Sequence, residues 1–379
     1  MAYHGQTISD GGVTWKVVDT RIYGDIAETP NFYARSGLFT ATNTSSTCKL
    51  TVPSKLLVNI GDRGYMAIGG EINLNATASW DTAQTTYATI ANRAGKDFYI
   101  YVCQQDGDTP KFVLSYSSTY PTGYTATNSR KIGGFHCLCA NVGTISDHSL
   151  SGLLAGHVLP LSIWDLKHRP VSDPEGMVWV EGLGKWIDIY LASWDSTNLK
   201  LVSQKGKNTA DGGSQYSQVW HGEKFVEKFG LVGKHLPNRD EFMVFAKGSN
   251  EKTAVTGSKD KVTTGGWTDT EGRRMISNYG IEDCCGFLWQ WTSDIVAFDD
   301  FLTTEYNVEN WSTASVYNET VDGESDFGSS YGSVHRGRVG GNWGGSSYCG
   351  SRCVAFNVFS SDVHTGHGAR GASEPRHFE

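Results

Sequence analysis

The C-terminal stretch GGNWGGSSYCGSRCVAFNVFSSDVHTGHGARG, residues 340–371, combines two kinds of sequence. Gly-Gly, Trp, Gly-Ser-Arg and Gly-Ala-Arg-Gly stand at separated points as large or conformationally special residues. The residues between them follow neither the two-residue period of a strand nor the 3.6-residue period of a helix. The pattern predicts an irregular C-terminal segment that a few framework residues hold in place.

The composition of the whole chain favours short strands and long ordered loops. The chain has 379 residues, which is enough for two or three domains. It contains 45 Gly and 12% aromatic residues, but only 19% charged residues, where globular proteins average about 25%. Such a composition is typical of β-rich proteins and argues against a helical bundle.

The charge and the apolar segments exclude several classes of partner. A net charge of −8, without a run of Lys or Arg, argues against nucleic acid, because phosphate binding needs a basic face. The apolar stretches end well before membrane-spanning length, so we expect no membrane insertion. The N-terminal residues lack a secretory signal. We therefore expect synthesis in a bacterial cytoplasm and exit, if any, by lysis or as part of a particle.

Alternating side chains near the N-terminus predict a strand, with Val13, Trp15 and Val17 on one face. A module of about forty residues buries little surface alone, so this one needs either a partner chain or the next domain. Further strand-like runs, separated by Gly, Asp, Asn and Thr clusters, predict an all-β region that extends to about residue 158. These runs are KLLVNIG, GYMAIGG, DFYIYVCQQ and KFVLSYSS.

Two segments predict helices in the C-terminal half. GEKFVEKFG places Phe225, Val226 and Phe229 on one face. LPNRDEFMVFAKGS places Asn238 at an N-cap with Glu241 three residues later, which is the spacing of a capping box.

Six segments occur in the order in which they stand in a known family: YPTGYTATNSRKIGGFH, SIWDLKHRPVSDPEGM, KWIDIYL, HLPNRDEF, CCGFLWQW and the GGNW…GSR…GAR tail. From about residue 45 to residue 379 the chain resembles the phage major tropism determinants, receptor-binding proteins of tail-fibre tips that a retroelement diversifies. HLPNRDEF, GFLWQW and Gly-Gly-x-Trp also resemble the formylglycine-generating-enzyme type of C-type lectin fold.

The resemblance implies a mainly β plus α+β protein in three parts. Residues 1–45 would form a trimerising, β-prism-like module, residues 46–158 a β-sandwich, and residues 159–379 a C-type lectin-like domain that carries the variable region, about 340–371. It further implies a homotrimer at the tail-fibre tip that binds a host cell-surface receptor, either protein or glycan, and has no enzymatic activity.

The resemblance also assigns the variable positions. Template AAC codons with replaced adenines encode fifteen residue types in that family, and Trp, Lys, Glu, Gln and Met are excluded. Aligned on the GGxW, GSR and GAR anchors, the twelve candidates all belong to the allowed set. They are Asn342, Gly344, Gly345, Ser346, Tyr348, Ala355, Asn357, Val358, Asp362, His364, Gly366 and His367. Tyr348 and His364 would be the anchors of the interface, because aromatic side chains supply rigid contact area.

The framework residues have a physical reason of their own. We expect Trp289, Trp291 and Trp343 to fill a core made of loops. Arg352 and Arg370 follow Gly-Ser and Gly-Ala, and a guanidinium group there can tie several loop carbonyls at once.

The alternatives to a binding surface are a plain C-terminal loop and an enzyme. Cys349 and Cys353 resemble the cysteine pair of a formylglycine-generating cysteine oxidase, but their spacing is C-x3-C where that family has C-x4-C. We expect these thiols to be structural, with Cys353 in the interior. The sequence signatures of calcium-dependent sugar lectins are absent. No cofactor is expected, although the acidic pairs Glu282–Asp283 and Asp299–Asp300 leave a structural calcium or magnesium ion open, without assigned ligands.

Overall fold

The computed structural model describes residues 7–10, 12–18, 33–61, 63–106, 109–211, 220–257, 263–298, 312–321, 324–330 and 333–376. The chain divides into two compact units, one of residues 1–189 with 374–379 and one of residues 190–373. This division differs from the expected three parts, because the expected boundaries at 45/46 and 158/159 both lie inside the first unit. Each unit is described by itself.

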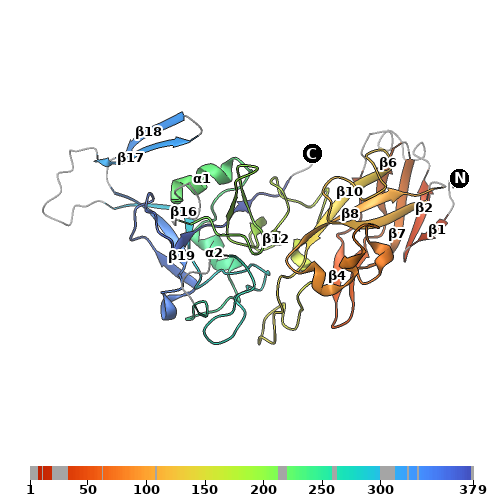
Figure 1. Ribbon diagram of the computed structural model, residues 1–379, viewed down its shortest axis with the longest axis horizontal. Coiled ribbons are helices and arrows are strands. Elements are labelled where there is room, and N and C mark those ends of the chain that lie inside the picture. The colour runs from red at the N-terminus through yellow and green to blue at the C-terminus, as the bar shows by residue number, and fades with distance from the viewer. Residues whose placement is uncertain are drawn as a thin grey trace. The chain divides into compact units, whose positions relative to one another are not determined.

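Unit 1 consists of antiparallel strands and short 3-10 turns (Figure 1). Its strands are β1 (Thr7–Asp10), β2 (Val13–Val18), β3 (Tyr33–Ala34), β4 (Thr40–Asn43), β5 (Cys48–Val52), β6 (Leu56–Ile60), β7 (Arg63–Asn73), β8 (Asp97–Gln104), β9 (Pro110–Ser115), β10 (Ser129–His136), β11 (Trp164–Asp165), β12 (Met177–Val180) and β13 (Lys185–Asp188). One sheet has the order β1-β2-β7-β5-β4, with β6 also on β7 and β3 on β6. A second sheet has the order β11-β10-β8-β9.

The N-terminal strands β1 and β2 are part of the first sheet. β2 pairs with β7, with Trp15 opposite Ala67. Trp15 is fully buried, and its ring centroid lies 4.8 Å from that of Phe112, on the second sheet. The N-terminal strand was expected to pack on either a partner chain or the next domain. In this structure it packs on the following segment of the same chain.

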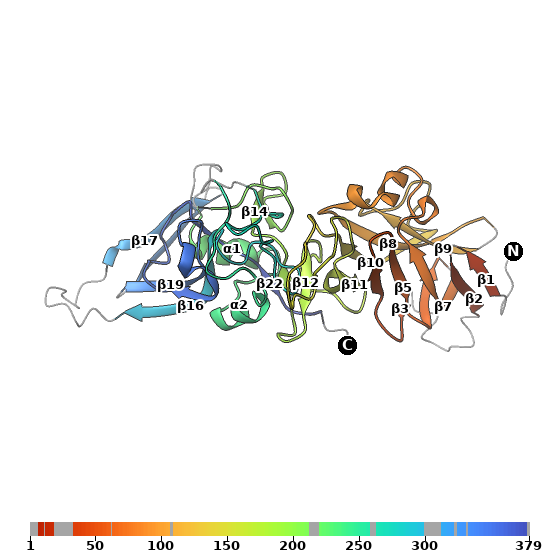
Figure 2. The ribbon, with the colours of Figure 1, turned by 90° about the horizontal axis from the view of Figure 1, so that it is seen from below.

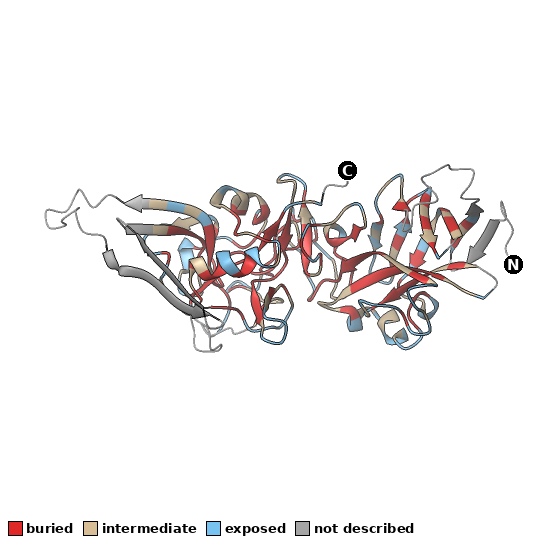
Figure 3. Ribbon diagram, turned by 90° about the horizontal axis from the view of Figure 1, so that it is seen from above, coloured by how far each residue is buried: buried red, intermediate tan, exposed pale blue. Residues whose placement is uncertain are grey.

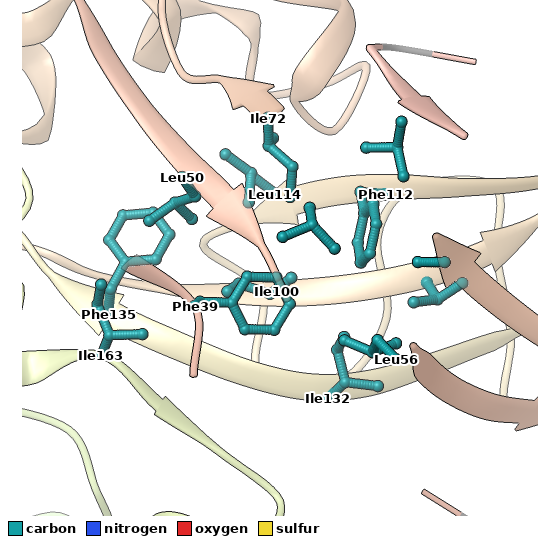
Figure 4. Packing of buried hydrophobic residues seen from close by; sticks show 14 of the residues in the cluster. Phe39, Leu50, Leu56, Ile72, Ile100, Phe112, Leu114, Ile132, Phe135 and Ile163 are labelled. Carbon is teal, nitrogen blue, oxygen red and sulfur yellow. The ribbon is translucent and has the colours of Figure 1, made fainter. Parts of the chain in front are cut away.

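The two sheets of unit 1 share one hydrophobic core. Leu50 and Leu56 on the first sheet and Ile100, Phe112 and Ile132 on the second belong to the same buried cluster (Figure 4). Burial of apolar side chains is the main stabilising contribution to such a body. The strands expected from the runs KLLVNIG, GYMAIGG, DFYIYVCQQ and KFVLSYSS are confirmed as β6, β7, β8 and β9.

Unit 2 contains the described α-helices and a small sheet with the order β20-β19-β16-β21 (Figures 1 and 2). Its elements are β14 (Ser193–Asp195), β15 (Lys200–Val202), α1 (Gly222–Gly230), α2 (Arg239–Phe245), β16 (Trp289–Phe298), β17 (Ser312–Val321), β18 (Glu324–Ser330), β19 (Ser333–Gly340), the 3-10 turn η7 (Ser346–Tyr348), β20 (Gly350–Ala355), β21 (His367–Gly368) and β22 (Ala372–Ser373). Helix α2 packs against β16, β19 and β20.

The capping box of α2 is confirmed. The Glu241 N–H donates to the Asn238 side chain at 2.8 Å, and the Asn238 N–H donates to the Glu241 carboxylate at 2.8 Å. Helix α1 has the expected bounds, but its apolar face is narrower than predicted. Phe225 and Phe229 are buried, whereas the side chain of Val226 is 45% exposed. His221, a residue type that sequence rules do not favour at an N-cap, accepts the hydrogen bond from the Lys224 N–H.

The chain is mainly β with short helices. Figure 3 shows that buried residues follow the strands of unit 1 and the interior of unit 2. Within the described ranges, no helix has the length and apolar character that crossing a membrane would require.

Candidate functional site

Both ends of the C-terminal segment are tied to the chain around the start of β16. The N–H of Gly286 donates to the carbonyl of Gly340 at 3.1 Å, and the N–H of Trp289 donates to the carbonyl of Gly366 at 2.9 Å. Strand β21 runs parallel to β16, with His367 opposite Trp289. The residues between these ties are irregular apart from η7 and β20. The segment is therefore held at both of its ends.

The Gly-Gly pair is required by backbone conformation and by space. Gly340 and Gly341 have φ angles of +85° and +77°, a region that other residues rarely adopt. A Cβ atom at residue 341 would lie 2.7 Å from Cys349 Sγ, and one at residue 340 would collide with the carbonyl of Cys284. Any larger residue would displace the start of the segment.

The three framework tryptophans are buried to different extents. Trp291 is fully buried in a cluster with Trp220, Phe225 and Phe229. Trp343 is half-buried and packs on a second cluster, which includes Phe287. Trp289 is half-buried as well, and its ring lies 5.2 Å from the guanidinium carbon of Arg338. These three placements fit the framework role that the sequence suggested.

Of the two framework arginines, only Arg370 is placed as expected. Arg370 is fully buried, and it donates to Gln290 Oε1 at 3.2 Å and to the carbonyl of Glu282 at 2.5 Å. Arg352 is exposed and has no hydrogen bond or ion pair with any residue that the structure describes. The Gly-Ser-Arg anchor is held instead by Ser351, whose hydroxyl donates to Glu251 Oε1 at 2.6 Å.

The twelve candidate positions differ in exposure. Exposed ones are Gly344, Ser346, Tyr348, Asn357 and His364; half-buried ones are Asn342, Gly345, Ala355, Val358 and Asp362; buried ones are Gly366 and His367. Tyr348 ends η7 with its side chain 80% exposed. The exposed positions thus lie between the two ties, from Gly344 to His364.

Three of the half-buried positions, Asn342, Gly345 and Val358, have structural contacts. Val358 packs against the cluster that contains Trp291. The carbonyl of Asn342 accepts from the N–H of Gly345 at 2.8 Å, and Cys349 Sγ donates to it at 3.3 Å. These candidate positions therefore take part in the packing and hydrogen bonding of the segment.

His367 is the clearest departure from a display surface. Its side chain is 3% exposed, and its ring lies 5.1 Å from that of Trp291. Its Nε2 contacts a guanidinium nitrogen of Arg338, and its Nδ1 lies 3.5 Å from Asp362 Oδ2. Burial, together with the charge of Arg338 and the neighbouring His364, lowers the pKa of His367 to about 3. The residue is therefore neutral at physiological pH and belongs to the interior.

The cysteine pair lacks the environment of an activated thiol. Cys349 is buried and free, and burial raises its pKa to about 11, with Cys353 adding to the shift. Cys353 is half-buried, not fully inside as expected, and burial raises its pKa as well. A raised pKa disfavours the thiolate, which is the reactive form.

The acidic pairs contribute to the interior where they are described. Arg274 Nη2 donates to both carboxylate oxygens of Glu282, at 2.6 and 2.8 Å. Asp283 accepts from the N–H of Gly265 at 2.7 Å, and burial followed by the charge of Glu282 raises its pKa to about 7. Asp299 and Asp300 lie outside the described residues. Within the described ranges, no three His, Cys, Asp or Glu side chains form a group that could hold a metal ion.

One aromatic residue of the surface was not predicted. Phe359 is 56% exposed, and its ring packs edge-on against that of His335 at 4.9 Å. It lies between the candidates Val358 and Asp362 in the chain, yet it is outside the twelve. Its position beside these candidates could have predicted a role in binding, because an exposed Phe in a segment of binding residues is itself a contact candidate.

The chain was compared with known proteins. A family model described as the Mtd second domain matches residues 41–165. The tail fiber receptor-binding protein of Bordetella phage BPP-1 is 32% identical over 324 residues, which are 81% of this chain and 78% of that protein. The chain belongs to the major tropism determinant family.

Solved structures of major tropism determinants agree with this assignment. The U1 variant superposes with a TM-score of 0.68 at 26% identity and covers 90% of this chain and 85% of its own. The M1 variant gives a TM-score of 0.70 at 25% identity, with coverage of 92% and 87%. The mainly β architecture with few helices is therefore that of the major tropism determinants.

Proposed function

We propose that this protein is the receptor-binding tip of a phage tail fibre, and that the exposed part of its C-terminal segment binds a host cell-surface receptor, protein or glycan. The observation that carries the proposal is the combination of pinned ends and exposed candidate positions within one segment. Its tail-fibre relative of phage BPP-1 is described as receptor-binding, which supports the same role here.

Tyr348 would be the main contact of this surface. Its ring is presented to solvent by the short η7 turn, where the N–H of Tyr348 donates to the carbonyl of Gly345 at 3.0 Å. Tyrosine supplies a large contact area at a small loss of side-chain entropy, and it is enriched among residues that dominate binding.

Cell binding tests this role. Fluorescently labelled wild-type protein is screened on a panel of bacterial strains, and Tyr348→Ala is then measured on the strains that bind. Loss of about tenfold or more in affinity is expected. Tyr120→Ala removes a tyrosine of 44% exposure from unit 1 and is the matched control, expected to bind as wild type. Equal binding by all three proteins, or no strain bound by the wild type, would contradict the proposal.

We further propose that the twelve positions are diversified by a retroelement. The residues at all twelve positions belong to the set that replaced adenines in AAC codons can encode. The flanking DNA tests the proposal directly. An imperfect repeat of the last hundred or so bases that differs only at adenines, beside a reverse-transcriptase gene, is the expected result, and its absence would overturn it.

The assembly is also part of the proposal. A homotrimer with a β-prism-like N-terminal module, a β-sandwich in the two sheets of unit 1 and a C-type lectin-like unit 2 would place three binding surfaces on one tip. Three weak sites together gain avidity of about 10² to 10⁴ without a new contact. We propose that binding needs no cofactor, so chelation by EDTA would leave it unchanged. Light scattering at micromolar concentration tests the trimer, and a monomer would contradict it.

A further inference from the structure

Arg338 is a charged side chain that contacts residues of the proposed binding surface. It lies on β19, which pairs with β20 on one side and with β16 on the other, and its side chain is 6% exposed. Its guanidinium carbon lies 5.2 Å from the ring centroid of Trp289 and 5.9 Å from that of Trp291. Two framework rings thus hold the guanidinium group at a defined place, with cation–π attraction.

The same guanidinium group contacts two of the candidate variable side chains. Nη2 donates to Asn357 Oδ1 at 2.8 Å. Nη1 contacts His367 Nε2. A guanidinium group can only donate, so His367 Nε2 accepts and the ring proton lies on Nδ1. That nitrogen faces Asp362 Oδ2 at 3.5 Å. Arg338 therefore connects three candidate variable positions. It contacts residues 357 and 367 directly, and it is connected to residue 362 through residue 367.

The connection has a consequence for diversification. If residue 367 becomes an apolar type, a buried donor of Arg338 loses its acceptor, and an unpaired buried donor is unfavourable. Among the residue types that the diversified codons allow, Asn, Asp, His, Ser, Thr and Tyr bring an acceptor, whereas Ala, Val, Leu, Ile and Phe bring none. The residue tolerated at 367 thus depends on the residues at 357 and 362.

We propose that Arg338 is a positioning residue of the binding surface, which couples the variable positions 357, 362 and 367 so that they vary as one group. The proposal rests on the proposed function for its meaning in binding. The coupling itself is a property of the folded chain and does not require a receptor.

A set of thermal unfolding measurements on the full chain tests the coupling. The variants are Arg338→Lys, Asn357→Ala, His367→Ala and their pairwise combinations. Lysine keeps the charge, but its single ammonium group does not reproduce the planar fork that serves both partners. We expect each substitution at 357 or 367 to lower Tm in the wild-type background and to have little further effect in the Arg338→Lys background.

Arg336 offers a matched control on the same strand. Its side chain is also 6% exposed, and it donates to the carbonyl of Thr292 at 3.1 Å and to Glu223 at 3.3 Å, neither of which is one of the twelve candidate positions. Arg336→Lys is expected to lower Tm, but its effect should add to that of Asn357→Ala. If Arg338→Lys does not fold, the double-mutant cycle of Asn357→Ala and His367→Ala tests the coupling alone. Both side chains contact the same guanidinium group, so their effects on Tm should not be additive.

The outcomes separate the two proposals. Additive Tm changes to within about 1 °C for all pairs, or equal coupling to Arg336, would overturn the role of Arg338. Coupling confined to Arg338 supports it, whether or not any strain is bound. On a strain bound by the wild type, Arg338→Lys is then expected to weaken binding at a temperature where the protein is folded, and Arg336→Lys to leave it unchanged; the reverse order would also overturn the proposal.

Discussion

The hydroxyl of Ser351 donates to a carboxylate oxygen of Glu251 at 2.6 Å, and the N–H of Ser351 donates to the same oxygen at 3.1 Å. This contact joins the middle of the C-terminal segment to a residue one hundred positions earlier. It attaches the segment at a further point, between the ties at Gly340 and Gly366. The exposed positions on either side of Ser351 are thereby divided into two shorter stretches.

Removal of the Ser351 hydroxyl should lower stability measurably. Ser351→Ala loses a hydrogen bond to a charged group at an exposed site, which corresponds to about 1 kcal/mol after screening by solvent. The expected fall in Tm is about 2 to 4 °C in a thermal melt. The neighbouring exposed Ser347 supplies the control, since Ser347→Ala should leave Tm unchanged. Equal melts for the two variants would show that Glu251 does not hold the segment.

The two framework arginines should differ strongly in their effect on stability. Arg370→Ala leaves Gln290 Oε1 and the carbonyl of Glu282 without a buried donor, and we expect a loss of about 3 kcal/mol or more. Arg352→Ala removes an exposed side chain, so its effect should stay within about 0.5 kcal/mol. Urea unfolding followed by Trp fluorescence measures both. A larger effect for Arg352 would restore its framework role.

His367 should make the protein less stable in acid. Its folded pKa of about 3 lies below the value of about 6.5 in an unfolded chain. Between these values the unfolded chain binds a proton that the folded chain does not. The contribution of neutral His367 is therefore complete above about pH 6.5 and declines as the pH falls toward about 3. Arg338 and His364 disfavour the proton, and Asp362 is the acid that faces the ring.

The variant His367→Asn isolates this contribution. Its Tm should fall less than that of the wild type between pH 7 and pH 4, because asparagine does not titrate. The difference between the two pH profiles is the quantity to measure. Parallel profiles would mean that His367 does not supply the pH dependence.

The thiols should react slowly in the folded protein. Cys349 is buried with a pKa of about 11, and Cys353 is half-buried with a raised pKa. Iodoacetamide at pH 8, followed by mass spectrometry, should label Cys353 faster than Cys349 and both far more slowly than in urea. Cys353→Ser should retain cell binding. Rapid native labelling of Cys349, or aldehyde formation on a cysteine peptide that is lost in Cys353→Ser, would favour the oxidase alternative.

Local patterns in the sequence predicted the local structure well. The capping box depends on Asn238 and Glu241, three residues apart, and the alternation around Trp15 is likewise a local pattern; the structure shows the capping box and a buried Trp15. Val226 is different, because its exposure depends on which part of the fold packs on α1. The helical pattern shows which residues are apolar, but it does not show how many of them the rest of the fold covers.

The same limit explains the errors in the C-terminal segment. The resemblance supplied the twelve positions, but His367 is buried because β21 pairs with β16, a contact with a strand about eighty residues earlier. Arg352 was expected to tie the segment because arginine has five donors, and the shorter Ser351 performs that role because Glu251 lies beside it. Neither relationship leaves a periodic or spacing signal in the sequence.

The most direct test of the proposed binding surface is to remove its exposed side chains while leaving the framework residues unchanged. The double variant Ser346→Ala, Tyr348→Ala removes two exposed side chains that belong to neither of the buried clusters around Trp291 and Phe287. On a strain that the wild type binds, the account predicts a Tm within about 2 °C of wild type and a loss of at least about tenfold in cell binding. Unchanged binding by the folded double variant would contradict the claim that this surface binds the receptor.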